Sequence, residues 1–156
     1  MRLYEAEFDR IEQLIGELVT NSHARLAFLI DRNGQLIAAS GDLEDVDTTS
    51  LASLTAGNMA SAGGLAKLLQ EDGFATQSHE GDHSRVTIQH VGAGRAILVV
   101  VFDDKTSMGL VRLRVLKTSE GLKKIFDAVD AQHQADRGQG AKAATVTDEE
   151  IDSLFD

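Results

Sequence analysis

The first stretch of the chain repeats hydrophobic residues with the period of a helix. Between residues 3 and 20 the recurring apolar positions are Tyr4, Phe8, Ile11, Ile15 and Leu18. These spacings of four, three, four and three place the five side chains in one stripe of an amphipathic helix. The pattern predicts a helix at 3–20 that packs one face against a core.

Two short runs that follow have the character of strands joined by a turn. Leu26–Ile30 is a continuous apolar run of strand length, and Gln35–Ser40 is the returning strand. Between them, Asn33-Gly34 supplies the positive φ angles that a tight hairpin turn needs. These residues predict a β-hairpin.

The remaining pattern completes one domain with an α+β order of elements. A Pro-free segment from about Asp47 to Glu71 predicts a second helix, and a third helix is expected from Met108 to His133. Three strands are expected between these helices, at Phe74–Glu80, Ser84–His90 and the uniformly apolar, central Arg95–Phe102. The order α-β-β-α-β-β-β-α predicts a five-stranded antiparallel sheet with helices packed on it.

The second helix is unusually poor in charge. From Thr48 to Gln70 its only charged residue is Lys67. One helical stripe should face the sheet and comprises Leu51, Leu54, Asn58, Ala62, Leu65 and Leu69. A second stripe is rich in small residues and comprises Ser53, Gly57, Ala60, Ser61, Gly64 and Leu68. Because a surface helix of a monomer normally has a charged face, either this helix is buried within the domain or protein–protein interfaces cover its outer faces, and we favour the interfaces.

Composition narrows the possible functions. The 156 residues carry a net charge of −10, which argues against nucleic-acid binding, because phosphate contacts depend on clustered Lys and Arg. The chain has no Cys, which suits a reducing cytoplasm, and no apolar stretch long enough to span a membrane. No signal peptide is expected from the acidic N-terminal residues.

The C-terminal end has a distinct composition. Residues 134–146 are small, polar and Gly-containing, so we expect a flexible linker after a domain at 1–133. Residues 147–156 hold five acids and no base, and Ile151, Leu154 and Phe155 fall on one helical face. This segment is expected to be an amphipathic docking tail that folds on a partner, although an unstructured solubilising tail is the alternative.

Several of these runs resemble the roadblock/dynein-light-chain family. The hairpin sequence from Phe28 to Ile37 is similar to its first hairpin, and the runs at 47–58 and 63–68 are similar to its second helix. The run Ser107–Arg114 resembles the opening of its last helix. The resemblance extends over nearly the whole chain and is greatest to the bacterial MglB group, including the acidic tail.

The resemblance implies a roadblock (profilin-like) fold and a homodimer whose sheets join and whose second helices lie side by side. It also implies a Ras-like small GTPase (MglA-like) as partner, GTPase activation without a supplied arginine, and a role in cell polarity and gliding motility. A cytoplasmic location follows, with a cell pole as one option. The expected partner-binding residues are Gly57, Ala60, Ser61, Gly64, Lys67, Leu68, Ile151, Leu154 and Phe155.

Candidate chemistry of the chain's own is weak. His79 and His83 match the spacing of a zinc motif, but Gly81-Asp82 between them predicts a turn rather than the required helix, so both should face solvent. The chain has no phosphate-binding P-loop sequence. Arg32, Arg85 and Arg95 could each be inserted into a GTPase, yet each is expected to be an ordinary surface charge. We therefore expect no active site, no metal and no cofactor.

Two other functions stay open. A roadblock dimer could be a scaffold that recruits a GTPase without accelerating hydrolysis. It could instead be a sensory module whose sheet holds a ligand, but that function predicts a polar-lined cavity, whereas this core is aliphatic.

Overall fold

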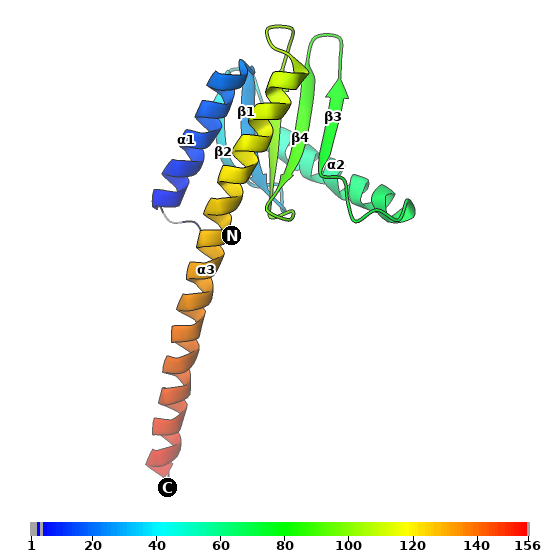
Figure 1. The fold of residues 1–156 in the computed structure, drawn as a ribbon. Coiled ribbons are helices and arrows are strands. Elements are labelled where there is room, and N and C mark those ends of the chain that lie inside the picture. Colours follow the sequence, from blue (N-terminus) through cyan, green and yellow to red (C-terminus); the bar gives the residue numbers. More distant parts are fainter. Residues whose placement is uncertain (1–2, 4, 156) are drawn as a thin grey trace.

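The protein is described by a computed structural model that covers the backbone of residue 3 and residues 5–155, and the side chains of residue 3 and residues 5–138. Its elements follow the expected order (Figure 1). They are α1 (Glu5–Ser22), β1 (Leu26–Asp31), β2 (Leu36–Gly41), α2 (Thr48–Leu68), β3 (Thr76–Glu80), β4 (Arg85–Val91), β5 (Ala96–Phe102) and α3 (Met108–Phe155).

The five strands form one antiparallel sheet in the order β2-β1-β5-β4-β3. β5 is central and almost wholly buried, as its uniformly apolar sequence predicted. β2 and β3 are the two edge strands, and each pairs with one neighbour within the described chain. The expected α+β class and strand count are confirmed.

The helices cover the sheet unequally. α1 and α3 lie on one face and α2 alone lies on the other (Figure 1). The α1/α3 side contains the larger core, to which α1 contributes Ile11, Ile15 and Leu18 as its stripe predicted. Phe8 of that stripe remains partly exposed, and Tyr4 lies outside the described residues.

The β1–β2 hairpin turns at the expected Asn33-Gly34. Asp31 accepts hydrogen bonds at its Oδ1 from the backbone amides of Asn33 (2.9 Å) and Gln35 (3.0 Å). Gly34 has a φ of 83°, and a Cβ added there would lie 3.2 Å from the Cβ of Ala56 on α2. Glycine is therefore needed at position 34 for two reasons: the turn requires a positive φ, and the hairpin approaches α2 closely there.

α3 is longer than expected. It continues past His133 to Phe155 and extends away from the sheet and the other helices (Figure 1). The stretch beyond His133 contains four Ala and no Pro, so its composition permits a helix despite two Gly. The linker expected at 134–146 thus lies within α3, and its flexibility and the docking role of residues 147–156 stay predictions. Among the described residues, no helix has both the length and the apolar character to cross a membrane.

Candidate functional site

The candidate site is the outer surface of α2, and a side-chain cap sets where that helix begins. Asp47 is the N-cap and accepts hydrogen bonds from the Ser50 amide (3.0 Å) and the Ser50 hydroxyl (2.6 Å). These two hydrogen bonds, with a weaker contribution from the Thr49 amide, hold the pKa of Asp47 below its ordinary value. The cap satisfies amides that the first turn of a helix leaves without partners.

The side of α2 that packs on the sheet is made of small and medium-sized residues. Ala52, Thr55, Met59 and Ala66 are buried there. The sheet supplies the bulk of this core, through Phe28, Ile88, Ile97 and neighbouring side chains. The helix can approach the sheet because its inward side chains are small.

The expectation that the leucine stripe faces the sheet is wrong. Leu54 is 73 % exposed, and Leu65 and Leu69 are also exposed. The buried side of α2 is centred on Ala52, Thr55 and Met59 instead, about 90° around the helix from the leucine stripe. Leu51 of that stripe packs partly against the same core. Periodicity could not determine this orientation because apolar residues occur on every side of α2.

All six residues predicted to bind a partner on α2 lie on its solvent-exposed side. They are Gly57, Ala60, Ser61, Gly64, Lys67 and Leu68. Leu68 is 83 % exposed, and a Cβ added at Gly57 or Gly64 would meet no atom within 4 Å. Intramolecular packing therefore does not require these two glycines. The remaining predicted residues, Ile151, Leu154 and Phe155, lie outside the described side chains.

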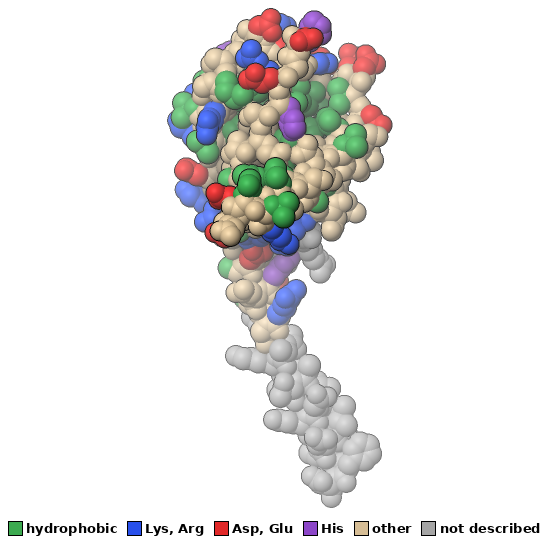
Figure 2. Space-filling model, turned by 90° about the vertical axis from the view of Figure 1, so that its right-hand side faces the viewer, with side chains coloured by type: hydrophobic (Ala, Val, Ile, Leu, Met, Phe, Trp, Pro, Cys, Tyr) green, Lys and Arg blue, Asp and Glu red, His purple; other side chains and the backbone are tan. Residues whose placement is uncertain are grey.

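The two stripes of α2 lie toward different parts of the molecule. On the leucine side, the Asn58 amide lies 3.4 Å from Nε2 of His79 on the edge strand β3. On the other side, the first half of α2 lies against the β1–β2 hairpin at Gly34. Figure 2 views the molecule from the side where α2 and β3 lie and shows groups of hydrophobic side chains on this surface. The leucines and the free edge of β3 thus belong to one continuous surface.

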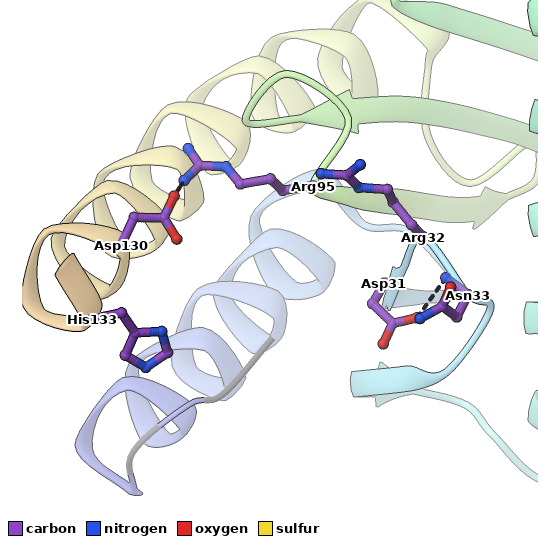
Figure 3. A pocket seen from close by; sticks show the side chains of 6 residues that line it. All are labelled: Asp31, Arg32, Asn33, Arg95, Asp130 and His133. Carbon is purple, nitrogen blue, oxygen red and sulfur yellow. Dashed lines mark hydrogen bonds and ion pairs between the residues drawn. The ribbon is translucent and has the colours of Figure 1, made fainter. Parts of the chain in front are cut away.

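Arg95 is not the ordinary surface charge that the sequence pattern predicted. Its guanidinium pairs with Asp130 of α3 (Figure 3). It also pairs with Asp127, and its Nε donates to the Gly92 carbonyl at 2.9 Å. It also lies over the Phe126 ring, 5.9 Å from the centroid. Hydrogen bonding from Arg95, supported by the charge of Lys123, lowers the pKa of Asp127. Arg95 therefore fastens the β4–β5 turn to α3, a contact across more than 30 residues that no local pattern signals.

The other residues with candidate chemistry lie where the sequence placed them. Arg32 and Arg85 are exposed, as are His79 on β3 and His83 in the β3–β4 turn. A cavity of about 420 Å³ lies between the β1–β2 hairpin, the β4–β5 turn and α3. Its lining residues are Asp31, Arg32, Asn33, Arg95, Asp130 and His133 (Figure 3). Within the described part of the chain, no group of three or more His, Cys, Asp or Glu side chains could hold a metal ion.

Comparison with known proteins identifies the family. The Roadblock/LC7 domain matches residues 10–102, which is more than half of the chain. The chain belongs to the Roadblock/LC7 family. An uncharacterised protein of the archaeon Methanocaldococcus jannaschii is 30 % identical over 121 residues, a match that covers 74 % of this chain and 99 % of the archaeal one.

Among solved structures, this Roadblock/LC7 chain is similar to bacterial MglB proteins. Myxococcus xanthus MglB is 49 % identical, with a TM-score of 0.77, over 82 % of this chain and 96 % of that one. The gliding protein MglB of Thermus thermophilus is 36 % identical, with a TM-score of 0.74, over 79 % and 93 %. A further MglB, described as having a tetrameric arrangement, is 34 % identical, with a TM-score of 0.75, over 79 % and 92 %. These likenesses confirm the roadblock fold and the resemblance to the MglB group.

Proposed function

We propose that this protein is a homodimeric regulator of a Ras-like small GTPase (MglA-like) and stimulates GTP hydrolysis by that partner. The observation that carries the proposal is the outer surface of α2, which is exposed, apolar and almost uncharged in a chain of net charge −10. An exposed apolar surface of this kind marks a protein–protein interface. The likeness to MglB proteins supports a role in polarity and gliding motility, in the cytoplasm and at a cell pole.

The two sides of α2 suit two different interfaces. The leucine side, with Leu54, Leu65 and Leu69, adjoins the free edge of β3, so a second copy could extend the sheet there and pack its own α2 alongside. Pairing at that edge would satisfy the outward backbone groups of β3. The small-residue side, with Gly57, Ala60 and Gly64, would then form the platform for the GTPase, since small residues allow a close approach.

Stimulation would come from positioning the partner's own catalytic residues. Arg95, the most conspicuous arginine of the domain, is held by two carboxylates of its own chain and is poorly placed to enter a GTPase. Arg32 and Arg85 are exposed, and within the described part of the chain neither forms a side-chain hydrogen bond or ion pair that would direct it. A platform that holds the switch loops in a reactive arrangement lowers the barrier without supplying a charge. The protein itself would act as a regulator and not as an enzyme.

Single-turnover hydrolysis by the purified cognate GTPase, with and without this protein, tests the proposal. We expect the wild type to accelerate hydrolysis and Gly64→Arg not to do so. The arginine side chain would hold α2 and the GTPase apart and leave a cation desolvated between them. Gln13→Arg adds the same charge on α1, on the other side of the sheet, and should stimulate normally.

Three outcomes would contradict parts of this proposal. Binding without stimulation would leave a scaffold that only recruits the GTPase. Loss of stimulation with intact binding in Arg32→Ala or Arg85→Ala would show that an arginine is supplied after all. Normal binding by a folded Gly64→Arg dimer would exclude the platform.

The C-terminal segment is proposed to strengthen the same complex. Its Ile151, Leu154 and Phe155 would dock on the GTPase once the platform engages, because tethering raises the local concentration to roughly the millimolar range. Deleting residues 147–156 should leave the dimer intact and weaken GTPase binding, above all at low salt. Equal affinity and equal stimulation with and without the segment, at low and high salt, would reduce it to a solubilising tail.

A further inference from the structure

The outward side of α3 is a second exposed apolar surface, separate from α2. α3 buries Val111, Val115 and Leu122 against the α1/α3 side of the core. On the opposite side of the same helix, Leu113 is 49 % exposed and Leu116 is 48 % exposed. At 100° per residue, these two leucines point away from the sheet. No element of the described chain covers them.

The same stretch of α3 is strongly basic although the chain is acidic. Residues 112–124 contain five bases and one acid, a net charge of +4 in a chain of −10. The bases are Arg112, Arg114, Lys117, Lys123 and Lys124. Lys123 is paired with Asp127 at 3.6 Å. Lys117 and Lys124 are exposed on the side of Leu113, and Glu120, also exposed, is the one acid between them. We call the surface formed by Leu113, Leu116, Lys117 and Lys124 the basic α3 surface.

One segment of this chain has the opposite chemistry. Residues 148–156 hold five acids and no base, together with Ile151, Leu154 and Phe155 at spacings that share one helical face. Acids beside apolar side chains match bases beside leucines in both charge and hydrophobicity. We propose that residues 148–156 of one copy dock on the basic α3 surface of a second copy.

With α3 as one helix, the acidic segment lies far from the basic surface of its own copy, so the docking proposed here is between copies. α3 is one helix to Phe155 and extends away from its own domain (Figure 1). Thirty-five residues separate Leu116 from Ile151, which is about 52 Å along a helix. Two α3 helices that run antiparallel would bring each acidic end to the basic surface of the other. Such a contact is self-complementary and closes at two copies.

This pairing is distinct from the proposed α2 dimer and does not depend on the GTPase. It uses the opposite face of the sheet from α2, so it would join α2 dimers in pairs. It would also occupy the acidic segment when no GTPase is bound. Because the pairing would join opposite charges, it should weaken as salt rises.

Charge reversal on the full-length chain tests the pairing. Lys117→Glu/Lys124→Glu makes the surface acidic, and Glu149→Lys/Glu150→Lys makes the segment basic. Each variant alone should repel itself and associate at least about tenfold more weakly than the wild type. An equimolar mixture should regain wild-type association, because both contacts of a mixed pair are then attractive. Sedimentation at about 50 mM and about 500 mM salt, over a range of protein concentrations, measures the doubling of particle mass.

A matched control changes the same charge elsewhere. Arg85→Glu/Lys105→Glu replaces two exposed bases outside the basic α3 surface and should associate like the wild type. Thermal unfolding of every variant checks that the domain folds. The proposal is overturned if the mixture fails to regain association or if either variant alone pairs normally. It is also overturned if the wild-type particle at low salt, up to about 1 mM protein, is never twice as heavy as the particle at high salt. Loss of GTPase stimulation in these variants would bear on the proposed function and not on the pairing.

Discussion

Arg95 joins three parts of the chain that are distant in sequence. Its side chain is only 18 % exposed and contacts the Gly92 carbonyl, two carboxylates of α3 and the Phe126 ring. Gly92 has a φ of 59°, in a region that favours glycine, so the β4–β5 turn is tightly shaped around this arginine. The turn and α3 are thereby fixed relative to each other where α3 leaves the domain.

Replacing Arg95 should destabilise the domain. Arg95→Met leaves Asp130 without its cation and Asp127 with Lys123 alone, and should lower the free energy of unfolding by about 1–3 kcal/mol. Arg95→Lys should recover only part of this, because a single ammonium cannot bridge two carboxylates and a carbonyl as a guanidinium does. Urea unfolding measures both. Arg85→Met, at an exposed arginine on β4, is the control and should change stability by no more than about 0.5 kcal/mol.

The Asp47 cap should give α2 a pH-dependent contribution to stability. Because the pKa of Asp47 is lowered in the folded state, its ionised form stabilises the fold above the ordinary pKa of 3.8. That contribution is lost as pH falls through the lower, folded-state pKa. Asp47→Asn keeps an acceptor at the cap but cannot ionise, so the stability difference from the wild type should shrink on acidification. Denaturant unfolding from about pH 6 downward measures it, and a difference that does not vary with pH would contradict the titration.

At the scale of elements, α2 carries a different role on each side. Met59 packs between helix and sheet, and Met59→Ala should cost about 2–5 kcal/mol at any protein concentration. Leu65 lies on the exposed leucine side, so Leu65→Ala should change the unfolding of an isolated chain by no more than about 0.5 kcal/mol. If the leucine side forms the dimer, the cost of Leu65→Ala should grow as protein concentration rises. Thermal unfolding at several protein concentrations distinguishes packing within one chain from packing at an interface. An effect of Leu65→Ala that does not change with protein concentration would place Leu65 outside any interface.

Sequence pattern predicted the elements well because each is encoded locally. The continuous apolar runs of β1 and β5 and the Asn33-Gly34 turn each specify a structure within a few residues. The orientation of α2 was not predictable, because the choice of inward side depends on the bulk of Phe28, Ile88 and Ile97 on distant strands. The Arg95 contact with α3 was missed for the same reason. The exposure of Gly57 and Gly64 agrees with the outward stripe that the sequence pattern predicted. Whether a partner contacts them is not encoded in any local spacing.

At the scale of the whole molecule, the sheet is covered by two helices on one face and by one on the other. The single helix α2 keeps its apolar leucine side exposed beside the free edge of β3. Association with a second copy should stabilise such a chain, because it would bury the leucines and pair the edge of β3. The basic α3 surface, in contrast, is charged, so salt should weaken the pairing proposed for it.

Glutamate pairs introduced on α2 or on α3 distinguish the proposed α2 dimer from the proposed α3 pairing. Light scattering at high salt, which suppresses the α3 contact, should give twice the chain mass of 16.8 kDa for the wild type. Leu54→Glu/Leu65→Glu should give the monomer mass with a folded spectrum, because buried carboxylates at the α2 interface would be desolvated without partners. Leu113→Glu/Leu116→Glu places the same charges on the outward side of α3 and should remain dimeric. A wild type that is monomeric under these conditions, or an α2 variant that stays dimeric, would remove the leucine side of α2 from the interface and with it the geometry proposed for the GTPase platform.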